Sequence, residues 1–181
     1  ELARLGSGRV APNPMVGAVL VYEGRIIGEG YHEQYGQAHA EPNCINSVAA
    51  EDRQFIPGAI MYVSLEPCAH FGKTPPCSDL IIQKRIKKII IGCGDPFSEV
   101  NGKGIAKLQN AGVEVVTGIL ETECEELNKR FFTFHTRRRP YIILKWAQTA
   151  NNKIGSDLQE RLLISNEHTN RLVHQWRSEE A

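Results

Sequence analysis

Residues 66–77 read Glu-Pro-Cys-Ala-His-Phe-Gly-Lys-Thr-Pro-Pro-Cys, and residues 39–41 read His-Ala-Glu. Together these stretches offer the imidazole of His39 and the thiolates of Cys68 and Cys77, a ligand set that suits zinc. Three protein ligands leave one coordination position for water, which is typical of a catalytic rather than a structural zinc. Zinc brings the pKa of that water toward about 7, so hydroxide becomes available at neutral pH. Glu41 is placed to move protons beside such a metal.

The zinc ligands are expected to meet at the N-termini of two helices. Pro42 is tolerated only in the first turn of a helix, so the first helix should begin close to His39. Side chains two residues apart in a helix interior point about 200° from each other. In the first turn, however, both His39 and Glu41 can reach a metal lying off the helix end. Cys77 lies just before a helix expected over 78–85, where the helix dipole favours thiolate over thiol.

The rest of the chain predicts an α/β fold. A hairpin is expected from strands over 15–22 and 25–30, joined by the two-residue turn Glu23-Gly24. Strands and helices then follow one another: helices over 39–50, 78–85, 103–111 and 121–133, and strands over 60–65, 88–92 and 113–117. Alternation of this kind indicates a sheet with parallel strands and helices packed against it.

The run Arg137-Arg138-Arg139-Pro140 predicts a domain boundary. We therefore expect one domain over residues 1–139 and the beginning of another unit over 140–181. The second stretch contains one expected strand, over 141–146, and one helix capped near Asn166. One strand and one helix cannot bury a core alone. Neither end of the chain carries helix start or stop signals, so we expect both to continue in a longer protein.

Charge and composition limit the partners. The chain has 21 Lys+Arg against 21 Asp+Glu, and a net charge of zero argues against sequence-independent binding to nucleic acid or anionic membrane. No apolar run approaches the roughly 20 residues of a membrane span, and residues 1–10 lack the apolar core of a signal peptide. We therefore expect a cytoplasmic protein. The five cysteines are too sparse for a disulfide framework, and Cys44, Cys93 and Cys124 are interpreted as small core residues.

Zinc nucleobase deaminases carry His-x-Glu followed by Pro-Cys-x-x-Cys, and this chain resembles them with a longer second half, Pro-Cys-x8-Cys. Residues 66–77, with Pro12-Asn13-Pro14-Met15-Val16-Gly17-Ala18-Val19 and Gly28-Glu29-Gly30-Tyr31-His32, resemble the deaminase half of the bifunctional riboflavin-biosynthesis deaminase/reductase family. Tyr141-Ile142-Ile143-Leu144-Lys145-Trp146-Ala147 resembles the opening strand of that family's reductase domain. The resemblance implies a three-layer α/β/α cytidine-deaminase-like domain with a central mixed sheet over 1–139, followed by the start of an α/β reductase domain.

The same resemblance implies an activity. It is the zinc-dependent hydrolytic deamination of diaminohydroxyphosphoribosylaminopyrimidine, a small phosphorylated pyrimidine, to the corresponding ribosylaminouracil phosphate and ammonia in riboflavin biosynthesis. In the complete protein an NADPH-dependent reductase would follow. We also expect a homo-oligomer, with no nucleic-acid or membrane partner.

Carried over position by position, the resemblance assigns zinc binding to His39, Cys68 and Cys77 and proton transfer to Glu41. It assigns substrate contacts to five further residues: Asn13, His32, Lys73, Thr74 and Asp95. Lys73 is the natural phosphate partner on charge alone. The chain departs from the family pattern at three places: Pro42 replaces Val, Phe97 replaces Asn, and Asn151-Asn152 replaces Asp-Gly.

Two other functions compete with this one. A nucleoside or nucleobase deaminase of the same superfamily would apply the same zinc chemistry in a pocket of different shape. A non-catalytic zinc protein would instead close the metal with a fourth protein ligand, which His70 could supply. Without the family resemblance, Lys73 and Thr74 could be ordinary solvated loop residues. His32 and Asp95 could likewise be a structural histidine and the opening of a turn.

Overall fold

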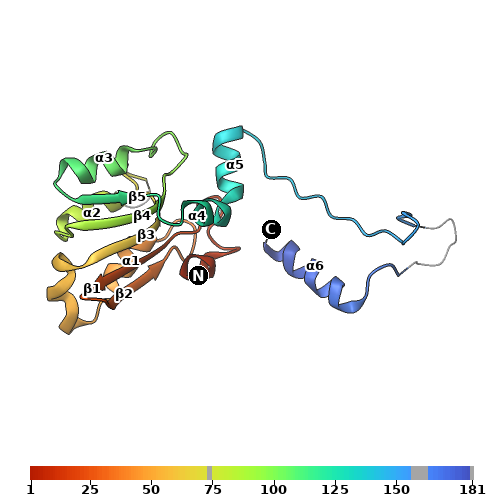
Figure 1. The fold of residues 1–181 in the computed structure, drawn as a ribbon, viewed down its shortest axis with the longest axis horizontal. Coiled ribbons are helices and arrows are strands. Elements are labelled where there is room, and N and C mark those ends of the chain that lie inside the picture. The colour runs from red at the N-terminus through yellow and green to blue at the C-terminus, as the bar shows by residue number, and fades with distance from the viewer. Residues whose placement is uncertain (73–74, 156–162, 180–181) are drawn as a thin grey trace. The chain divides into compact units, whose positions relative to one another are not determined.

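The computed structural model describes residues 1–72, 75–155 and 163–179 (Figure 1). The chain divides into two units, Glu1–Pro140 and Tyr141–Ala181. Across the described residues, no helix combines the length and the apolar character that crossing a membrane requires.

The first unit is built on one mixed sheet of five strands. Its strands are β1 (Gly17–Tyr22), β2 (Arg25–Tyr31), β3 (Ile60–Leu65), β4 (Lys88–Cys93) and β5 (Glu114–Thr117). They lie in the order β2-β1-β3-β4-β5. β1 is antiparallel to β2 and β3, whereas β4 is parallel to β3 and β5. Glu23 and Gly24 turn the predicted hairpin with φ of 49° and 78°, the positive values that a tight two-residue turn requires.

Helices α1, α2 and α3 share one core on one face of the sheet. The helical segments of the first unit are η1 (Leu2–Gly6), α1 (Ala40–Asn46), η2 (Ala50–Gly58), α2 (Cys77–Gln83), α3 (Lys103–Asn110), α4 (Glu121–Leu127) and α5 (Lys129–Arg137). Leu20, Met61 and Ile89 come from three neighbouring strands and are fully buried. They belong to the same cluster as Cys44 of α1 and Ile81 of α2. This core fixes where the first turns of α1 and α2 lie.

Helix α4 packs on the opposite face of the sheet. Successive side chains of a strand point to opposite faces, so Gly92 points away from the core that its neighbour Ile91 enters. A Cβ on Gly92 would lie 2.4 Å from Sγ of Cys124 in α4. Helices therefore cover both sides of the sheet, and the predicted α/β architecture is confirmed.

Helix α1 lies directly on the backbone of β2. A Cβ on Gly30 would come within 2.1 Å of the Cys44 nitrogen, and one on Gly28 within 2.6 Å of the Cys44 carbonyl oxygen. These two glycines let helix and strand approach more closely than any side chain would permit. The sequence Gly28-Glu29-Gly30 thus sets the distance between β2 and α1.

Helix α1 is shorter than the predicted helix over 39–50. It ends at Asn46, and a separate 3-10 segment, η2, follows. The Ser47 hydroxyl donates to the Cys44 carbonyl at 2.8 Å and accepts the Glu29 N–H at 2.9 Å. These bonds connect the end of α1 to β2. A pattern of apolar residues does not reveal such bonds, so it does not predict where the helix ends.

The single helix predicted over 121–133 is two helices, broken at Asn128. Asn128 is buried, and its side chain accepts the Met15 N–H at 2.8 Å and donates to the Met15 carbonyl at 2.9 Å. The Asn128 backbone, with φ −111° and ψ 26°, leaves helical geometry to make this contact. The break therefore serves an interaction with the distant segment that contains Asn13.

The second unit contains one described helix, α6 (Glu167–Glu179). It begins as predicted, because the Asn166 side chain accepts the Thr169 N–H at 2.9 Å. The strand predicted over 141–146 is wrong: no described strand pairs with these residues, and Leu144 is 78% exposed. β-Branched and aromatic residues fit a strand, but a strand also needs a neighbour for its backbone hydrogen bonds.

Candidate active site

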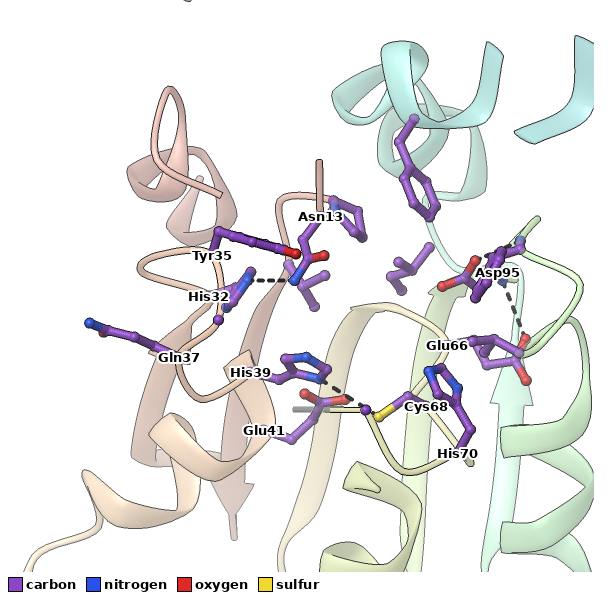
Figure 2. Close-up of a pocket in the computed structure, with 18 residues that line it drawn as sticks. Asn13, His32, Tyr35, Gln37, His39, Glu41, Glu66, Cys68, His70 and Asp95 are labelled. Carbon is purple, nitrogen blue, oxygen red and sulfur yellow. Dashed lines mark hydrogen bonds between the residues drawn. The ribbon is translucent and has the colours of Figure 1, made fainter. Parts of the chain in front are cut away.

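Three potential metal donors converge where α1 and α2 begin. His39 is the residue before α1, Cys77 is the first residue of α2, and Cys68 lies in the loop after β3. His39 Nδ1 lies 3.6 Å from Cys68 Sγ and 3.4 Å from Cys77 Sγ. All three donor atoms lie within 4.8 Å of one another. Figure 2 shows His39 and Cys68 facing each other across the base of a pocket.

This donor set fits zinc in number and chemistry. One imidazole nitrogen and two sulfurs are preferred zinc ligands, and they form the only cluster of three or more such donors in the part of the chain that the structure describes. His70 does not belong to the cluster. Its Nδ1 is buried with no hydrogen-bond partner among the described residues, and its ring packs against Phe97 at 6.2 Å between centroids. The expected fourth ligand of a structural zinc site is therefore not found in this cluster.

The surroundings of Cys68 and Cys77 shift the pKa values of their thiols in opposite directions. The Cys77 thiol donates to Cys68, and this bond, with His39 and the Cys77 N–H at 3.3 Å, lowers the pKa of Cys68 to about 4. The resulting thiolate, together with burial, raises the pKa of Cys77. Zn²⁺ binds thiolates rather than thiols, so binding requires Cys77 to lose its proton.

Glu41 lies in the first turn of α1, beside the donor cluster (Figure 2). It is 3% exposed. Burial raises the pKa of its carboxyl group, and the Cys68 thiolate raises it further. A raised pKa makes the carboxylate a stronger base, which suits a group that accepts and returns a proton. The predicted position of His39 and Glu41 at the helix start is confirmed.

His32 and Asn13 form a hydrogen-bonded pair at the pocket wall (Figure 2). His32 Nδ1 lies 2.9 Å from the Ala38 carbonyl oxygen, which can only accept, so Nδ1 carries the proton. Burial lowers the pKa of His32, which keeps the ring neutral and leaves Nε2 an acceptor. Asn13 Nδ2 donates to Nε2 at 3.1 Å. This orientation leaves Asn13 Oδ1 as an acceptor for a ligand.

Asp95 is a second buried acid of the pocket. Its Oδ1 accepts the Phe97 N–H at 2.8 Å. Burial raises the pKa of Asp95 to about 6, and the nearby charges of Glu66 and Cys68 contribute to this increase. Asp95 therefore changes charge close to physiological pH.

Phe97, one of the departures from the family pattern, forms part of an aromatic wall. Its ring lies 5.0 Å from His135 between centroids, and His135 lies 4.4 Å from Phe131. Phe97 and Phe131 both line the pocket. At position 97 this chain offers a ring face where an asparagine would offer hydrogen bonds.

The pocket has a volume of about 260 Å³. It combines donors from the metal cluster, polar side chains and apolar walls, and its lining comprises Asn13, Pro14, Val16, His32, Tyr35, Gly36, Gln37, His39, Glu41, Leu65, Glu66, Cys68, His70, Gly72, Asp95, Phe97, Val100 and Phe131. The structure thus brings Asn13, His32 and Asp95 to the donor cluster. Lys73 and Thr74 lie outside the described residues.

Sequence reasoning missed Glu66 and Asn128. Glu66 stands in the quoted stretch two residues before Cys68, but its partners lie in a loop whose course the sequence does not reveal. Asn128 interrupts a helical pattern with a residue of low helix propensity, which is the one signal that could have drawn attention to it.

Comparison with known proteins places this geometry in a family. The family model described as the cytidine and deoxycytidylate deaminase zinc-binding region matches residues 2–93. This chain belongs to that family. The matched residues include all three donors and Glu41. Family and donor cluster together identify zinc as the cofactor.

The relatives confirm the resemblance to riboflavin-biosynthesis deaminase/reductases. The chain is 45% identical over 179 residues to riboflavin biosynthesis protein RibD of Aquifex aeolicus, covering 99% of this chain and 49% of that protein. It is 45% identical over 132 residues to the diaminohydroxyphosphoribosylamino-pyrimidine deaminase of Buchnera aphidicola, covering 73% of this chain and 87% of that protein.

A solved structure agrees with the sequence relatives. The Thermotoga maritima diaminohydroxyphosphoribosylaminopyrimidine deaminase/5-amino-6-(5-phosphoribosylamino)uracil reductase superimposes with a TM-score of 0.88 at 45% identity, covering 97% of this chain and 50% of that one. The chain therefore spans about half the length of the RibD proteins that it matches.

Proposed function

We propose that this chain catalyses the hydrolytic deamination of diaminohydroxyphosphoribosylaminopyrimidine in riboflavin biosynthesis. The observation that carries the proposal is the convergence of His39, Cys68 and Cys77 within 4.8 Å, with buried Glu41 beside them at a pocket. The similarity to a Buchnera protein that is named for this deaminase reaction, and that the chain covers over 87% of its length, supports the substrate.

The three donors would hold the ion through His39 Nδ1 and the two sulfurs. Zinc, when bound, supplies the Lewis acidity that makes hydroxide available near neutral pH. The Glu41 carboxylate would take a proton from the attacking water and deliver it to the ring nitrogen of the pyrimidine. It would then pass the second water proton to the exocyclic amine, which leaves as ammonia while the carbon gains a carbonyl oxygen. Burial of Glu41 keeps bulk water from competing for these protons.

Substrate positioning would fall to the walls of the pocket. Asn13 Oδ1, oriented through His32, would accept a hydrogen bond from an N–H group of the pyrimidine. Asp95 would contact the polar edge of the same ligand, and the aromatic face of Phe97 would pack against it. Lys73 and Thr74 remain proposed phosphate contacts from the family pattern.

The complete protein would carry further functions. We propose an NADPH-dependent reductase whose first part is residues 140–181, in a homo-oligomeric cytoplasmic protein. The name of the maize relative, a chloroplastic riboflavin biosynthesis protein, shows that location varies among relatives. Light scattering on the full-length protein tests the oligomer, and cell fractionation tests the location.

Ammonia release from zinc-loaded protein tests the deaminase proposal. The phosphorylated diaminopyrimidinone should be deaminated, whereas cytidine, deoxycytidylate, adenosine and guanine should not, and chelation should abolish turnover. Activity on one of the other four would retain the zinc chemistry and overturn the substrate. Zinc binding without activity on any of the five would favour a structural metal.

A further inference from the structure

Glu66 is a buried acid that the proposed deamination does not use. It follows β3 directly, lies two residues before Cys68, and is 4% exposed. Its carboxylate accepts four backbone N–H groups: Oε1 accepts from Gly104 at 2.9 Å and Ile105 at 3.2 Å, and Oε2 from Gly102 at 3.0 Å and Asp95 at 3.3 Å. One side chain therefore connects the zinc-ligand segment to both ends of the loop over 94–102 and to the start of α3.

Among the residues that the structure describes, these bonds are the hydrogen-bonded link between the loop and the rest of the molecule beyond α3. Other hydrogen bonds of the loop are internal or run to the first turn of α3, such as Val100 N–H to the Phe97 carbonyl at 2.8 Å. Among the described residues, every hydrogen bond between residues 94–102 and a partner outside the loop and α3 goes to the Glu66 carboxylate. Figure 2 shows one of them, between Glu66 and Asp95.

Backbone packing reinforces the same connection. A Cβ on Gly104 would lie 1.9 Å from the Pro67 carbonyl oxygen. The first turn of α3 therefore lies directly against the backbone of Pro67, the residue between Glu66 and Cys68. Both contacts hold the loop and α3 at a defined distance from the zinc-ligand segment.

The loop carries one wall of the pocket, through Asp95, Phe97 and Val100. Cys68, in contrast, is held from the other side as well. Its sulfur accepts the Cys77 N–H at 3.3 Å, and its carbonyl accepts the Ser78 N–H at 3.1 Å. Loss of the Glu66 bonds would thus move the substrate wall while the zinc ligands stay in place.

We propose that Glu66 is a positioning residue for substrate binding, which fixes the pocket wall formed by residues 94–102 against the zinc-ligand segment. This proposal rests on the deaminase function proposed above. It also predicts that replacing Glu66 weakens substrate binding but leaves zinc content and the chemical step unchanged. Substrate affinity depends on the pocket wall, whereas zinc content and the chemical step depend on the metal cluster and Glu41.

The test compares Glu66→Gln with Glu29→Gln in the full-length protein. Glutamine keeps the length of Glu66 but turns an NH₂ group toward two of the four donors, so two hydrogen bonds are lost. Glu29 is exposed on β2 and gives a matched control. We expect the KM for the pyrimidine to rise about tenfold in Glu66→Gln, with kcat within about threefold of wild type. Zinc content should be unchanged in both variants.

Hydrogen exchange gives a readout that does not depend on activity. In wild type, the four N–H groups that Glu66 accepts should exchange more slowly than those of Ser98 and Glu99, which lie exposed in the same loop. In Glu66→Gln they should exchange faster, whereas Glu29→Gln should leave them unchanged.

Several results would overturn the proposal. One is an unchanged KM in Glu66→Gln, and another is loss of zinc together with kcat, which would place the role of Glu66 at the metal. If Glu66→Gln does not fold, hydrogen exchange of the wild-type protein still tests the proposal. Exchange at the four N–H groups that is as fast as at Ser98 would reject the proposal. A wild-type protein that binds zinc but releases no ammonia would overturn the proposed function and with it the substrate role. The exchange comparison would still decide whether Glu66 holds the loop.

Discussion

Three buried carboxyl groups of the pocket differ because their surroundings differ. Glu41 lies beside a thiolate, and burial together with that charge raises its pKa. Glu66 accepts four backbone N–H groups, which fix the position of its carboxyl group. Asp95 accepts one N–H group and has a pKa of about 6. The same functional group thus supplies a proton carrier in Glu41, a structural contact in Glu66 and a group with a pKa of about 6 in Asp95.

Glu41→Gln should retain zinc but lose turnover. Glutamine has nearly the size of glutamate but cannot accept and return a proton, so kcat should fall by roughly 10² or more. Metal analysis and ammonia release on the same sample measure both effects. An unchanged kcat would remove Glu41 from its role.

Cys68→Ser and Cys77→Ser should each lose zinc, because serine does not supply the thiolate that the cluster requires. Elemental analysis after dialysis measures the metal. Cys124→Ser is the control, since Cys124 contacts Gly92 outside the cluster and should leave the zinc content at the wild-type value. Wild-type zinc content in Cys68→Ser or Cys77→Ser would rule out that residue as a ligand.

Asp95→Asn should stabilise the protein above pH 6 and have little effect below pH 4. Burial raises the pKa of Asp95 from 3.8 to about 6, so the folded state binds its proton more tightly than the unfolded state does. The energetic cost of ionising Asp95 in the fold is absent at low pH, grows between these two values and is complete above the higher one. Asparagine keeps the Oδ1 acceptor and removes this cost, about 2–3 kcal/mol.

Urea unfolding of wild type and Asp95→Asn at pH 4 and pH 8 measures the difference. A gain in the free energy of unfolding that is equal at both pH values would contradict the assignment to ionisation of Asp95.

At the scale of elements, the sequence predicted what local patterns determine. The hairpin turn at Glu23-Gly24 and the strands over 60–65 and 88–92 follow from turn chemistry and β-branched runs, and the start of α1 follows from Pro42. The end of α1 and the break between α4 and α5 could not be predicted. Ser47 and Asn128 cause them through bonds to residues far away in the sequence.

Asn128→Ala should destabilise the first unit by about 2 kcal/mol or more, because the Met15 N–H and carbonyl would both lose their partner. Urea unfolding followed by circular dichroism measures the loss. Asn110→Ala is the matched control, since Asn110 is exposed at the end of α3 and should change stability by less than about 0.5 kcal/mol. Equal losses in the two variants would show that the bonds to Met15 contribute nothing specific.

At the scale of the whole molecule, the sequence correctly predicted that His39, Cys68 and Cys77 come together, and it wrongly predicted a strand over 141–146. The convergence of the donors could be predicted because one histidine and two cysteines near the starts of two expected helices form a set that suits one zinc ion. The strand prediction failed because β-branched and aromatic residues indicate only a tendency, and a strand forms only where a neighbouring strand accepts its backbone hydrogen bonds. Glu66 illustrates a third case, in which a residue inside the recognised stretch has a role that depends on how a distant loop folds.

A protein that ends at Pro140 should bind zinc and deaminate the pyrimidine with a kcat within about threefold of that of the longer protein. The reason is that removing groups that do not contact the reacting atoms leaves transition-state binding unchanged. Every described residue that lines the pocket lies within Glu1–Pro140. Steady-state kinetics of the two proteins, with equal zinc content, checks this expectation. Loss of activity with retained zinc and fold would show that residues beyond Pro140 complete the site.

The three donors come from separate segments of the sequence, and this separation has a consequence for folding. His39 and Cys77 follow different strands of the sheet and lie 38 positions apart in the chain. An ion held by both would act as a removable cross-link that closes this segment into a ring and lowers the entropy of the unfolded chain as long as it stays bound. The melting temperature of the protein would then fall as the chelator concentration rises. Zinc would stabilise the fold as well as take part in the reaction.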